Sequence, residues 1–553
     1  MKNGELLPTS IVNENRIGIR WGIVLAAVIF LLIYLPWITP ACELFRHEGL
    51  YAACAGEYTP GLYVTAHGVV QSKVFPLYPM TVALLQKVFS DLPVETALRI
   101  VSITMMAAWA FLASAAVARR RNIRCALVTF CCCTGTLLTM EKGINGGAET
   151  MTAFFLLAAQ LSFFHFGSRK ANWDSAWIWS AVFLVFAFLC GGLTAIIFFV
   201  FPMFFFRRPL SLRSKFNTPG FPAGVVFVSL FVILWAVPLG LALRETTQSV
   251  WEDFSMNYFK ELLTFPFLFP CRMLPWFVLG WMPFCVALQA TDPTPVFSRY
   301  LRTLFFSSLF LLWFMPSRVS ARCVFVIAPL AMMTGLYYEA GIRCYGRSLR
   351  KLLVAGEIFL TGLFVAAVSF CLLPGDMLSL FGNAAKMSFR TNSRYLWIMA
   401  GVSVLLAGLA AVFHFGRRKL PVWILVLMIS GGLTLFYTSV MLPYRMQKQE
   451  LRQLARDINN ALAKEKNAGV LYKYELDGLY GGLFYTGRKI RKWQSAEWLR
   501  DQETVYLISA GIPRDTRRIW SSTPLLFRNT PLSLWKGELR KDNFDDAGAH
   551  NEL

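Results

Sequence analysis

The side chains best suited to chemistry gather in one long stretch, residues 39–89, which follows the first apolar segment of the chain. This stretch carries three acids, two histidines and a lysine just before a proline-containing apolar run: Glu43, Glu48, Glu57, His47, His67 and Lys73. Carboxylates and imidazoles accept or release protons in catalysis, and a lysine neutralises an anion. The pattern therefore indicates proton transfer beside a negatively charged group, with His67 interpreted as an ordinary loop residue.

The composition predicts what must hold this stretch in place. Of the 553 residues, 56% are hydrophobic, 15% are aromatic and only 16% are charged. A soluble protein carries about a quarter charged residues. The hydrophobic residues form blocks long enough to cross a ~30 Å hydrocarbon layer, which takes about 20 helical residues. The sequence therefore predicts an α-helical polytopic membrane protein, in which membrane lipids surround the chain.

The net charge of +22 does not indicate a nucleic-acid partner. The basic residues lie in short loops between apolar blocks, as the positive-inside rule predicts, and no run of aromatic and basic residues marks a nucleic-acid surface. The twelve cysteines include no paired CxxC motifs, so no zinc site is expected. Only Cys42 and Cys54 share a loop outside the apolar blocks, where a disulfide is one alternative.

The apolar blocks predict about thirteen membrane crossings. They cover residues 21–38, 97–118, 126–140, 151–166, 176–190, 194–206, 223–243, 274–290, 304–315, 324–338, 352–373, 396–415 and 422–442. The loops alternate between basic and acidic, which places the N-terminus in the cytoplasm and the stretch 39–89 outside. An odd number of crossings then places the tail outside as well, and interfacial helices are expected in the first outer loop.

The tail changes composition. It begins with a charged amphipathic stretch at 445–467 and continues with β-branched segments of strand character, GVLYKYEL, KIRKW and TVYLIS. The segments LYGGLFYTG and SAEWLRDQ read as short helices or turns between them. We therefore expect a transmembrane domain at 1–443 and a small extracytoplasmic α/β domain at 444–553.

Several short motifs occur in a fixed order along the chain. They are His47-Glu48-Gly-Leu-Tyr51-Ala52, Glu57, Gly61-Leu-Tyr63, Ser72-Lys73 with Pro76, Leu98-Arg99, Ala148-Glu149-Thr-Met151, Phe269-Pro270 to Pro283, Ser317-Arg318-Val-Ser320-Ala-Arg322 with Pro329, and Leu483-Phe484-Tyr485-Thr-Gly487-Arg488. This ordered set resembles the lipid-linked-sugar glycosyltransferases of the C-type fold, the family of the protein O-mannosyltransferases and the bacterial lipid A aminoarabinose transferase.

The resemblance implies an inner-membrane enzyme that moves a sugar from a polyprenyl-phosphate donor to a lipid, glycan or protein acceptor on the outer face, with inversion. It implies three groups of site residues. Catalytic candidates are Glu48, His47 and Glu43; donor phosphate candidates are Lys73, Arg318 and Arg322; substrate-binding candidates are Glu149, Tyr51 and Glu57. No cofactor is implied, and a divalent metal ion stays open as an alternative.

Departures from the family pattern keep other interpretations open. His47 stands where the family has an aspartate, Ser72 where it has a glutamate, and arginines replace both lysines of the Ser-Lys-Gly-Lys motif. The residues do not choose the base among Glu48, Glu43 and His47. An inactive relative that only binds its ligand is therefore one alternative. A lipid or sugar transporter is another, although the acids lie in loops and not within the spans, where transporters place them.

Overall fold

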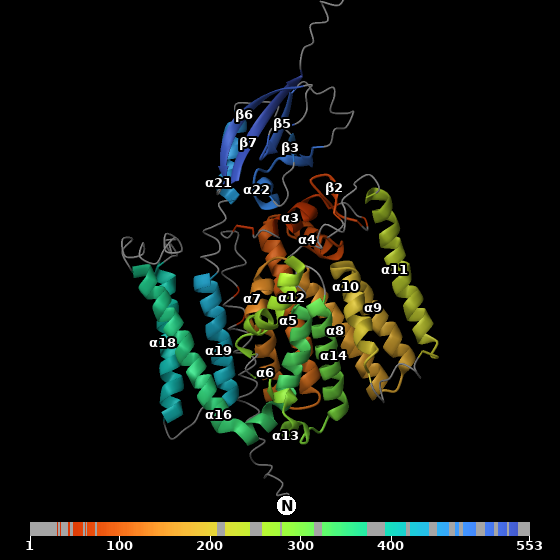
Figure 1. Cartoon of the computed structure of the whole chain (residues 1–553), viewed down its shortest axis with the longest axis vertical. Helices are drawn as coiled ribbons and strands as arrows, with labels where there is room; N and C mark the ends of the chain where they lie inside the picture. The colour runs from red at the N-terminus through yellow and green to blue at the C-terminus, as the bar shows by residue number, and fades with distance from the viewer. Residues whose placement is uncertain are drawn as a thin grey trace, which may run out of the picture.

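The computed structural model describes most of the helical part and the core of the tail. The described residues are Phe30, Tyr34, 43–44, 48–58, 61, 63–71, 74–206, 216–243, 257–276, 279–314, 323–372, 393–415, 421–441, 451–463, 470–474, 479–493, 504–511, 513, 518–527 and 530–539. Figure 1 shows a helical bundle with a β-sheet standing on one end, directly above α3 and α4.

The first loop folds into two short helices and a hairpin. Helix α3 covers Glu48–Gly56, strands β1 and β2 cover Thr65–Ala66 and Val69–Val70, and α4 covers Leu77–Val88. His67 and Gly68 form the hairpin turn with φ angles of 57° and 73°, as a two-residue turn of this type requires. The Glu57 carboxylate accepts hydrogen bonds from both turn amides, at 2.9 and 3.1 Å.

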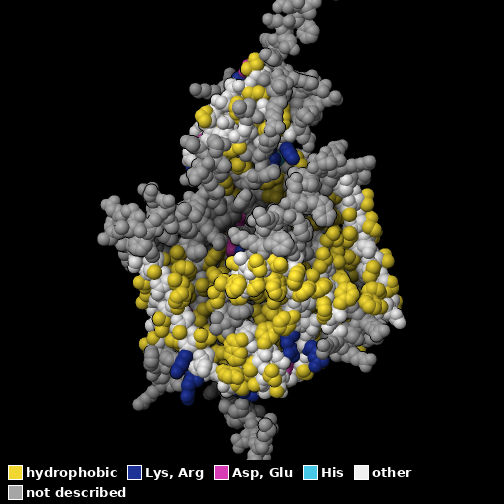
Figure 2. Space-filling view, in the orientation of Figure 1, with side chains coloured by type: hydrophobic (Ala, Val, Ile, Leu, Met, Phe, Trp, Pro, Cys, Tyr) yellow, Lys and Arg dark blue, Asp and Glu magenta, His cyan; other side chains and the backbone are white. Residues whose placement is uncertain are grey.

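The bundle consists of apolar helices. Its described elements are α5 (Val94–Ala118), α6 (Ile123–Thr134), α7 (Leu137–Ile144), α8 (Glu149–Phe164), α9 (Trp173–Gly191), α10 (Leu193–Met203), α11 (Gly220–Leu243), α12 (Asn257–Arg272), α13 (Val286–Gln289), α14 (Pro295–Phe314), α16 (Val324–Leu372), α18 (Ser393–Phe415) and α19 (Val422–Phe436). Figure 2 shows hydrophobic side chains as a broad band across the face in view, with Lys and Arg side chains below the band.

Six of the described helices are long and apolar enough to cross a membrane, or seven if the bent pair α6–α7 counts as one span. The polytopic helical class is therefore confirmed, while thirteen crossings stay a prediction. The first predicted span, 21–38, lies almost entirely outside the described residues.

Two predicted spans differ from the structure. The block 126–140 bends by 67° between α6 and α7, where Thr136 caps α7 by accepting the Thr139 amide at 3.2 Å. The block 274–290 was predicted as one span, and this is wrong: its described residues form turns and the short helix α13. Pro275 and Pro283 explain the difference because proline lacks the amide that an interior helical position needs.

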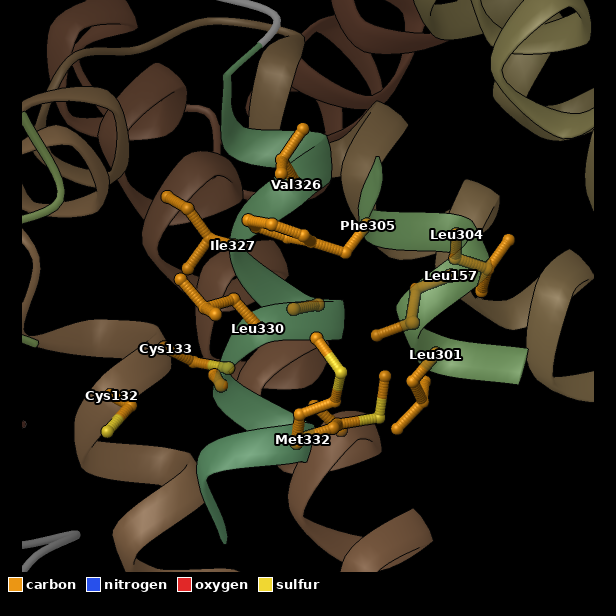
Figure 3. Close-up of a cluster of buried hydrophobic side chains, with 14 of the residues drawn as sticks. Cys132, Cys133, Leu157, Leu301, Leu304, Phe305, Val326, Ile327, Leu330 and Met332 are labelled. Carbon is orange, nitrogen blue, oxygen red and sulfur yellow. The ribbon is translucent and has the colours of Figure 1, made fainter. Parts of the chain in front are cut away.

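The bundle core is built where α16 meets α6, α8 and α14. Figure 3 shows Leu330 and Met332 of α16 beside Cys133 of α6, Leu157 of α8 and Leu301 of α14. These side chains are buried within one large apolar cluster, so Cys133 behaves as a small hydrophobic residue here.

The C-terminal region, defined here as residues 451–539, has a separate core. It contains α21 (Leu451–Leu462), α22 (Tyr480–Phe484) and five strands in the order β4-β3-β5-β7-β6. The predicted strands are confirmed as β3 (Val470–Lys473), β4 (Lys489–Lys492) and β5 (Thr504–Ser509). The hairpin of β6 (Arg518–Phe527) and β7 (Thr530–Leu539) was not predicted. The segment SAEWLRDQ and the proposed domain boundary at 443/444 lie outside the described residues.

The C-terminal region docks on the first loop through a close backbone contact. Gly49 of α3 packs so tightly against Tyr480 and Gly481 of α22 that an added Cβ would collide with their backbone atoms. Beside this contact the His67 ring stacks on Tyr480 with centroids 5.0 Å apart. Burial and the nearby Lys473 lower the pKa of His67 to about 3, so the docked imidazole is neutral at pH 7.

We predict that Gly49→Ala separates α3 from α22, because backbone atoms cannot move aside for the added methyl group. The expected loss is about 1–3 kcal/mol of stability, as for other overpacked sites, measured by thermal unfolding in detergent. Gly56→Ala on the same helix is the control, since no atom lies within 4 Å of its Cβ position. Equal stability of the two variants would contradict the docking contact.

Candidate functional site

The centre of the candidate site is a buried ion pair between the first loop and the bundle. Glu48 is the first residue of α3, and Arg99 lies in the second turn of α5. Arg99 Nη2 and Nε lie 3.1 and 3.4 Å from the two Glu48 carboxylate oxygens. The Glu48 side chain is 0% exposed and the Arg99 side chain is 1% exposed. Both charged groups are buried away from water, so each needs the other to offset the free-energy cost of its desolvation.

The turn between α7 and α8 supplies a third contact to this pair. The Gly146 amide donates a hydrogen bond to Glu48 Oε1 at 2.6 Å. A side chain at this position would collide with Leu98, which explains why glycine occupies the turn. Ser102 on α5 donates to the Lys142 and Asn145 carbonyls at 3.2 and 3.1 Å. The turn is therefore held against the same helix that carries Arg99.

Two tyrosines and a second acid surround the pair. Tyr51 and Tyr78 pack edge to face with centroids 5.1 Å apart, and Tyr78 donates to the Leu98 carbonyl at 2.9 Å. Burial, reinforced by the Glu149 charge, raises the pKa of Tyr51. Burial and the Glu48 charge raise the pKa of Tyr78. Both phenols therefore stay protonated at neutral pH and act as hydrogen-bond donors.

A cluster of cations lies on the other side of the turn. Lys142 Nζ lies 3.0 Å from Glu149 Oε1, and the two side chains are 11% and 23% exposed. Burial raises the pKa of Cys323 to about 12, and the charges of Arg272 and Lys142 act in the opposite direction. Both cations therefore lie near the start of α16. Arg272 is partly exposed and Lys142 is paired with Glu149, so an anion that binds here meets two cationic side chains and competes with the Glu149 carboxylate for one of them.

The structure gives two predicted site acids other partners. The carboxylate oxygens of Glu43 accept from the Leu451 and Arg452 amides at the beginning of α21. Those of Glu57 accept from the hairpin turn amides. Catalysis by Glu43 and substrate binding by Glu57 stay predictions, while both carboxylates serve the architecture of the loop.

The remaining sequence candidates fall outside the described residues. These are His47, Lys73, Arg318 and Arg322. Cys54 is a buried free thiol, and its predicted alternative partner Cys42 also lies outside the described residues. Within the described ranges, no three His, Cys, Asp or Glu side chains gather as a metal ion would need.

Sequence reasoning predicted Glu48, Tyr51 and Glu149, and the structure brings these three residues together around the 145–148 turn. It missed Lys142, Arg272 and Tyr78. One sequence signal was available for Lys142, because a lysine in a predicted outer loop departs from the positive-inside trend. Tyr78 carries no such signal, since a buried tyrosine in an apolar run reads as an ordinary core residue.

The fold is shared with two solved structures of ArnT. The crystal structure of ArnT from Cupriavidus metallidurans in the apo state matches with a TM-score of 0.67 at 15% sequence identity, covering 93% of this chain and 98% of that chain. The ArnT structure bound to undecaprenyl phosphate matches with a TM-score of 0.64 at 15% identity, covering 93% and 97%. No protein-family model and no curated protein matches the sequence. The predicted resemblance is therefore confirmed at the level of the fold.

We predict that the structural and chemical roles of Glu48 can be separated. Arg99→Met leaves a buried carboxylate unpaired and should cost about 3–5 kcal/mol, measured by thermal unfolding. Adding Glu48→Gln removes that charge and should recover a large part of the stability.

The double variant Arg99→Met/Glu48→Gln should be inactive, although it is folded, if the Glu48 carboxylate takes part in the reaction. A double variant as unstable as Arg99→Met alone would contradict the coupling of the two charges. Recovery of activity together with stability would limit Glu48 to a structural role.

Proposed function

We propose that the protein is an integral-membrane glycosyltransferase that moves a sugar from a polyprenyl-phosphate donor to an acceptor. The observation that carries the proposal is the arrangement of the site. The buried Glu48–Arg99 pair contacts the turn between α7 and α8, the Lys142–Glu149 pair joins the two helices on either side of that turn, and Lys142 and Arg272 both act on Cys323, in a fold shared with ArnT. One of the ArnT structures contains undecaprenyl phosphate, and a ligand of that class fits a cationic site at the end of an apolar bundle.

The proposed reaction needs two kinds of group. A hydroxyl or amine of the acceptor attacks the anomeric carbon, the bond from that carbon to the phosphate oxygen breaks, and the configuration inverts. Negative charge develops on the leaving polyprenyl phosphate, and cations aimed at it lower the barrier. Lys142 and Arg272 are the described candidates. Lys73, Arg318 and Arg322 are the sequence candidates for the same role.

The acceptor proton goes to a base. We assign this role to Glu48, with His47 as the alternative, because Glu48 lies among Tyr51, Tyr78 and Glu149. The contacts to Arg99 and to the Gly146 amide hold its carboxylate in one orientation. Loss of a general base costs about two to four orders of magnitude in rate, so Glu48→Gln should fall in this range and His47→Asn should cost much less.

The finer parts of the prediction belong to the same proposal. We place the protein in the inner membrane of a bacterium, with the N-terminus in the cytoplasm and the C-terminal region outside. The acceptor is a lipid, a glycan or a protein. The basic residues below the apolar band support this orientation.

The function is tested by comparing lipids, glycans and glycoproteins of a deletion strain with those of the parent by mass spectrometry. Loss of one sugar modification supports the proposal and identifies the acceptor. The purified protein should then transfer that sugar from its polyprenyl-phosphate donor. Donor binding without turnover would indicate an inactive relative, and unchanged sugar modification in the deletion strain would contradict the proposal.

We predict that Lys142→Gln weakens binding of the donor phosphate. A hydrogen bond to a charged group contributes about 1.5–3 kcal/mol, so the Kd for polyprenyl phosphate should rise roughly tenfold to a hundredfold. Lys170→Gln, a charge change beyond the other end of α8, is the matched control. An unchanged Kd for Lys142→Gln would move the phosphate site away from Lys142.

A further inference from the structure

Glu43 is hydrogen-bonded on two sides, and the two sides belong to different parts of the molecule. Its carboxylate accepts from the Leu451 and Arg452 amides at 2.9 and 3.2 Å. Its backbone carbonyl accepts from Arg99 Nη2 at 2.8 Å. The same nitrogen lies 3.1 Å from Glu48 Oε2. Glu43 therefore stands between the C-terminal region and the buried ion pair.

The first of these contacts is a helix cap supplied from a distant part of the chain. The first amides of a helix have no partner within the helix, and the helix dipole favours a negative charge there. Leu451 begins α21, and the carboxylate that serves its free amides lies 408 residues earlier. The position of Glu43 is therefore fixed by the C-terminal region.

Further contacts hold the same short segment. The Leu44 amide donates to the Tyr485 hydroxyl at 2.9 Å. Arg452 Nη2 lies 3.7 Å from Glu95 Oε1. Glu95 lies on α5, one helical turn before Arg99. These contacts tie α21 and α22 to both partners of the ion pair, the loop that leads into Glu48 and the helix that carries Arg99.

The guanidinium of Arg99 is planar, and its donors have a fixed geometry. One of its nitrogens is shared between the Glu43 carbonyl and Glu48. A shift of Glu43 must therefore rotate the guanidinium or lengthen one of these bonds. Either change would alter the direction in which the Glu48 carboxylate points.

We propose that Glu43 is a positioning residue through which the C-terminal region sets the orientation of the Glu48–Arg99 pair. This inference rests on the proposed function for its effect on catalysis. In this role Glu43 acts through Arg99 and Glu48, which differs from the direct catalytic role that the sequence predicted for it. The C-terminal region then has a catalytic purpose without contributing a group to the reaction.

The test uses the full-length protein with Glu43→Gln, which keeps the size and the backbone carbonyl but removes the charge. If the whole stabilisation that a cap gives a helix is passed on to the Glu48–Arg99 pair, its loss lowers kcat by up to roughly thirtyfold, while the donor KM stays unchanged. Asp457→Asn makes the same charge change on the exposed face of α21 and is the matched control. Glu43→Asp keeps the carboxylate and should restore a part of kcat.

Hydrogen exchange gives a readout that needs no substrate. The Gly146 amide donates to Glu48 and lies in a different loop from Glu43. If Glu43 positions the pair, exchange in the peptide covering 144–148 should be faster in Glu43→Gln than in Asp457→Asn. Faster exchange confined to the beginning of α21 would limit Glu43 to a local cap and overturn the inference.

The two proposals fail in different ways. A wild-type protein without turnover contradicts the proposed function, while the exchange at 144–148 still decides whether Glu43 positions the pair. An active wild type with normal kcat and normal exchange in Glu43→Gln overturns the inference alone. If Glu43→Gln does not fold, Glu43→Asp is compared with Asp457→Asn instead. Its shorter carboxylate should lower kcat and speed exchange at 144–148 in the same direction, by a smaller amount.

Discussion

The ion pair between Glu48 and Arg99 is the constraint on which the rest of the site depends. Both side chains are almost completely excluded from solvent, and a buried charge that loses its partner costs several kcal/mol. The first loop and α5 must therefore dock together, and the Gly146 amide adds the turn between α7 and α8 to the same contact. Once these three elements are in place, Tyr78 donates to the Leu98 carbonyl next to Arg99, Tyr51 packs on Tyr78, and Glu149 pairs with Lys142 beside the same turn.

The C-terminal region extends this constraint beyond the bundle. It has its own hydrophobic core, yet its contacts with Glu43, Leu44 and Gly49 are backbone contacts or caps that tolerate little displacement. Such contacts fix the position of the first loop more than they add to the stability of the protein, because each involves few atoms. The region is therefore well suited to hold the loop that carries Glu48, and less suited to act as an independent module attached by a tether.

The similarity to ArnT establishes the path of the backbone, and at 15% identity the chemistry has to be argued from the residues themselves. Here the residues carry their own evidence. Lys142 and Arg272 bring positive charge to the start of α16, and Arg99 together with the Gly146 amide holds the Glu48 carboxylate in a fixed position. His47 and Ser72, which depart from the family pattern, lie outside the described residues.

The sequence by itself determined the features that depend on local composition and periodicity. These are the apolar helices, three of the five strands described in the tail, and the choice of Glu48 and Glu149 as candidates, which stand out because acids are rare in such a chain; Tyr51 was a candidate through the family resemblance. Only the tertiary structure decided what those acids contact. Periodicity does not reveal that Glu43 caps a helix 408 residues away, that Glu57 holds a hairpin turn, or that Lys142 and Arg272 converge. Each of these depends on the docking of elements far apart in the chain, which is set by the packing of the whole bundle.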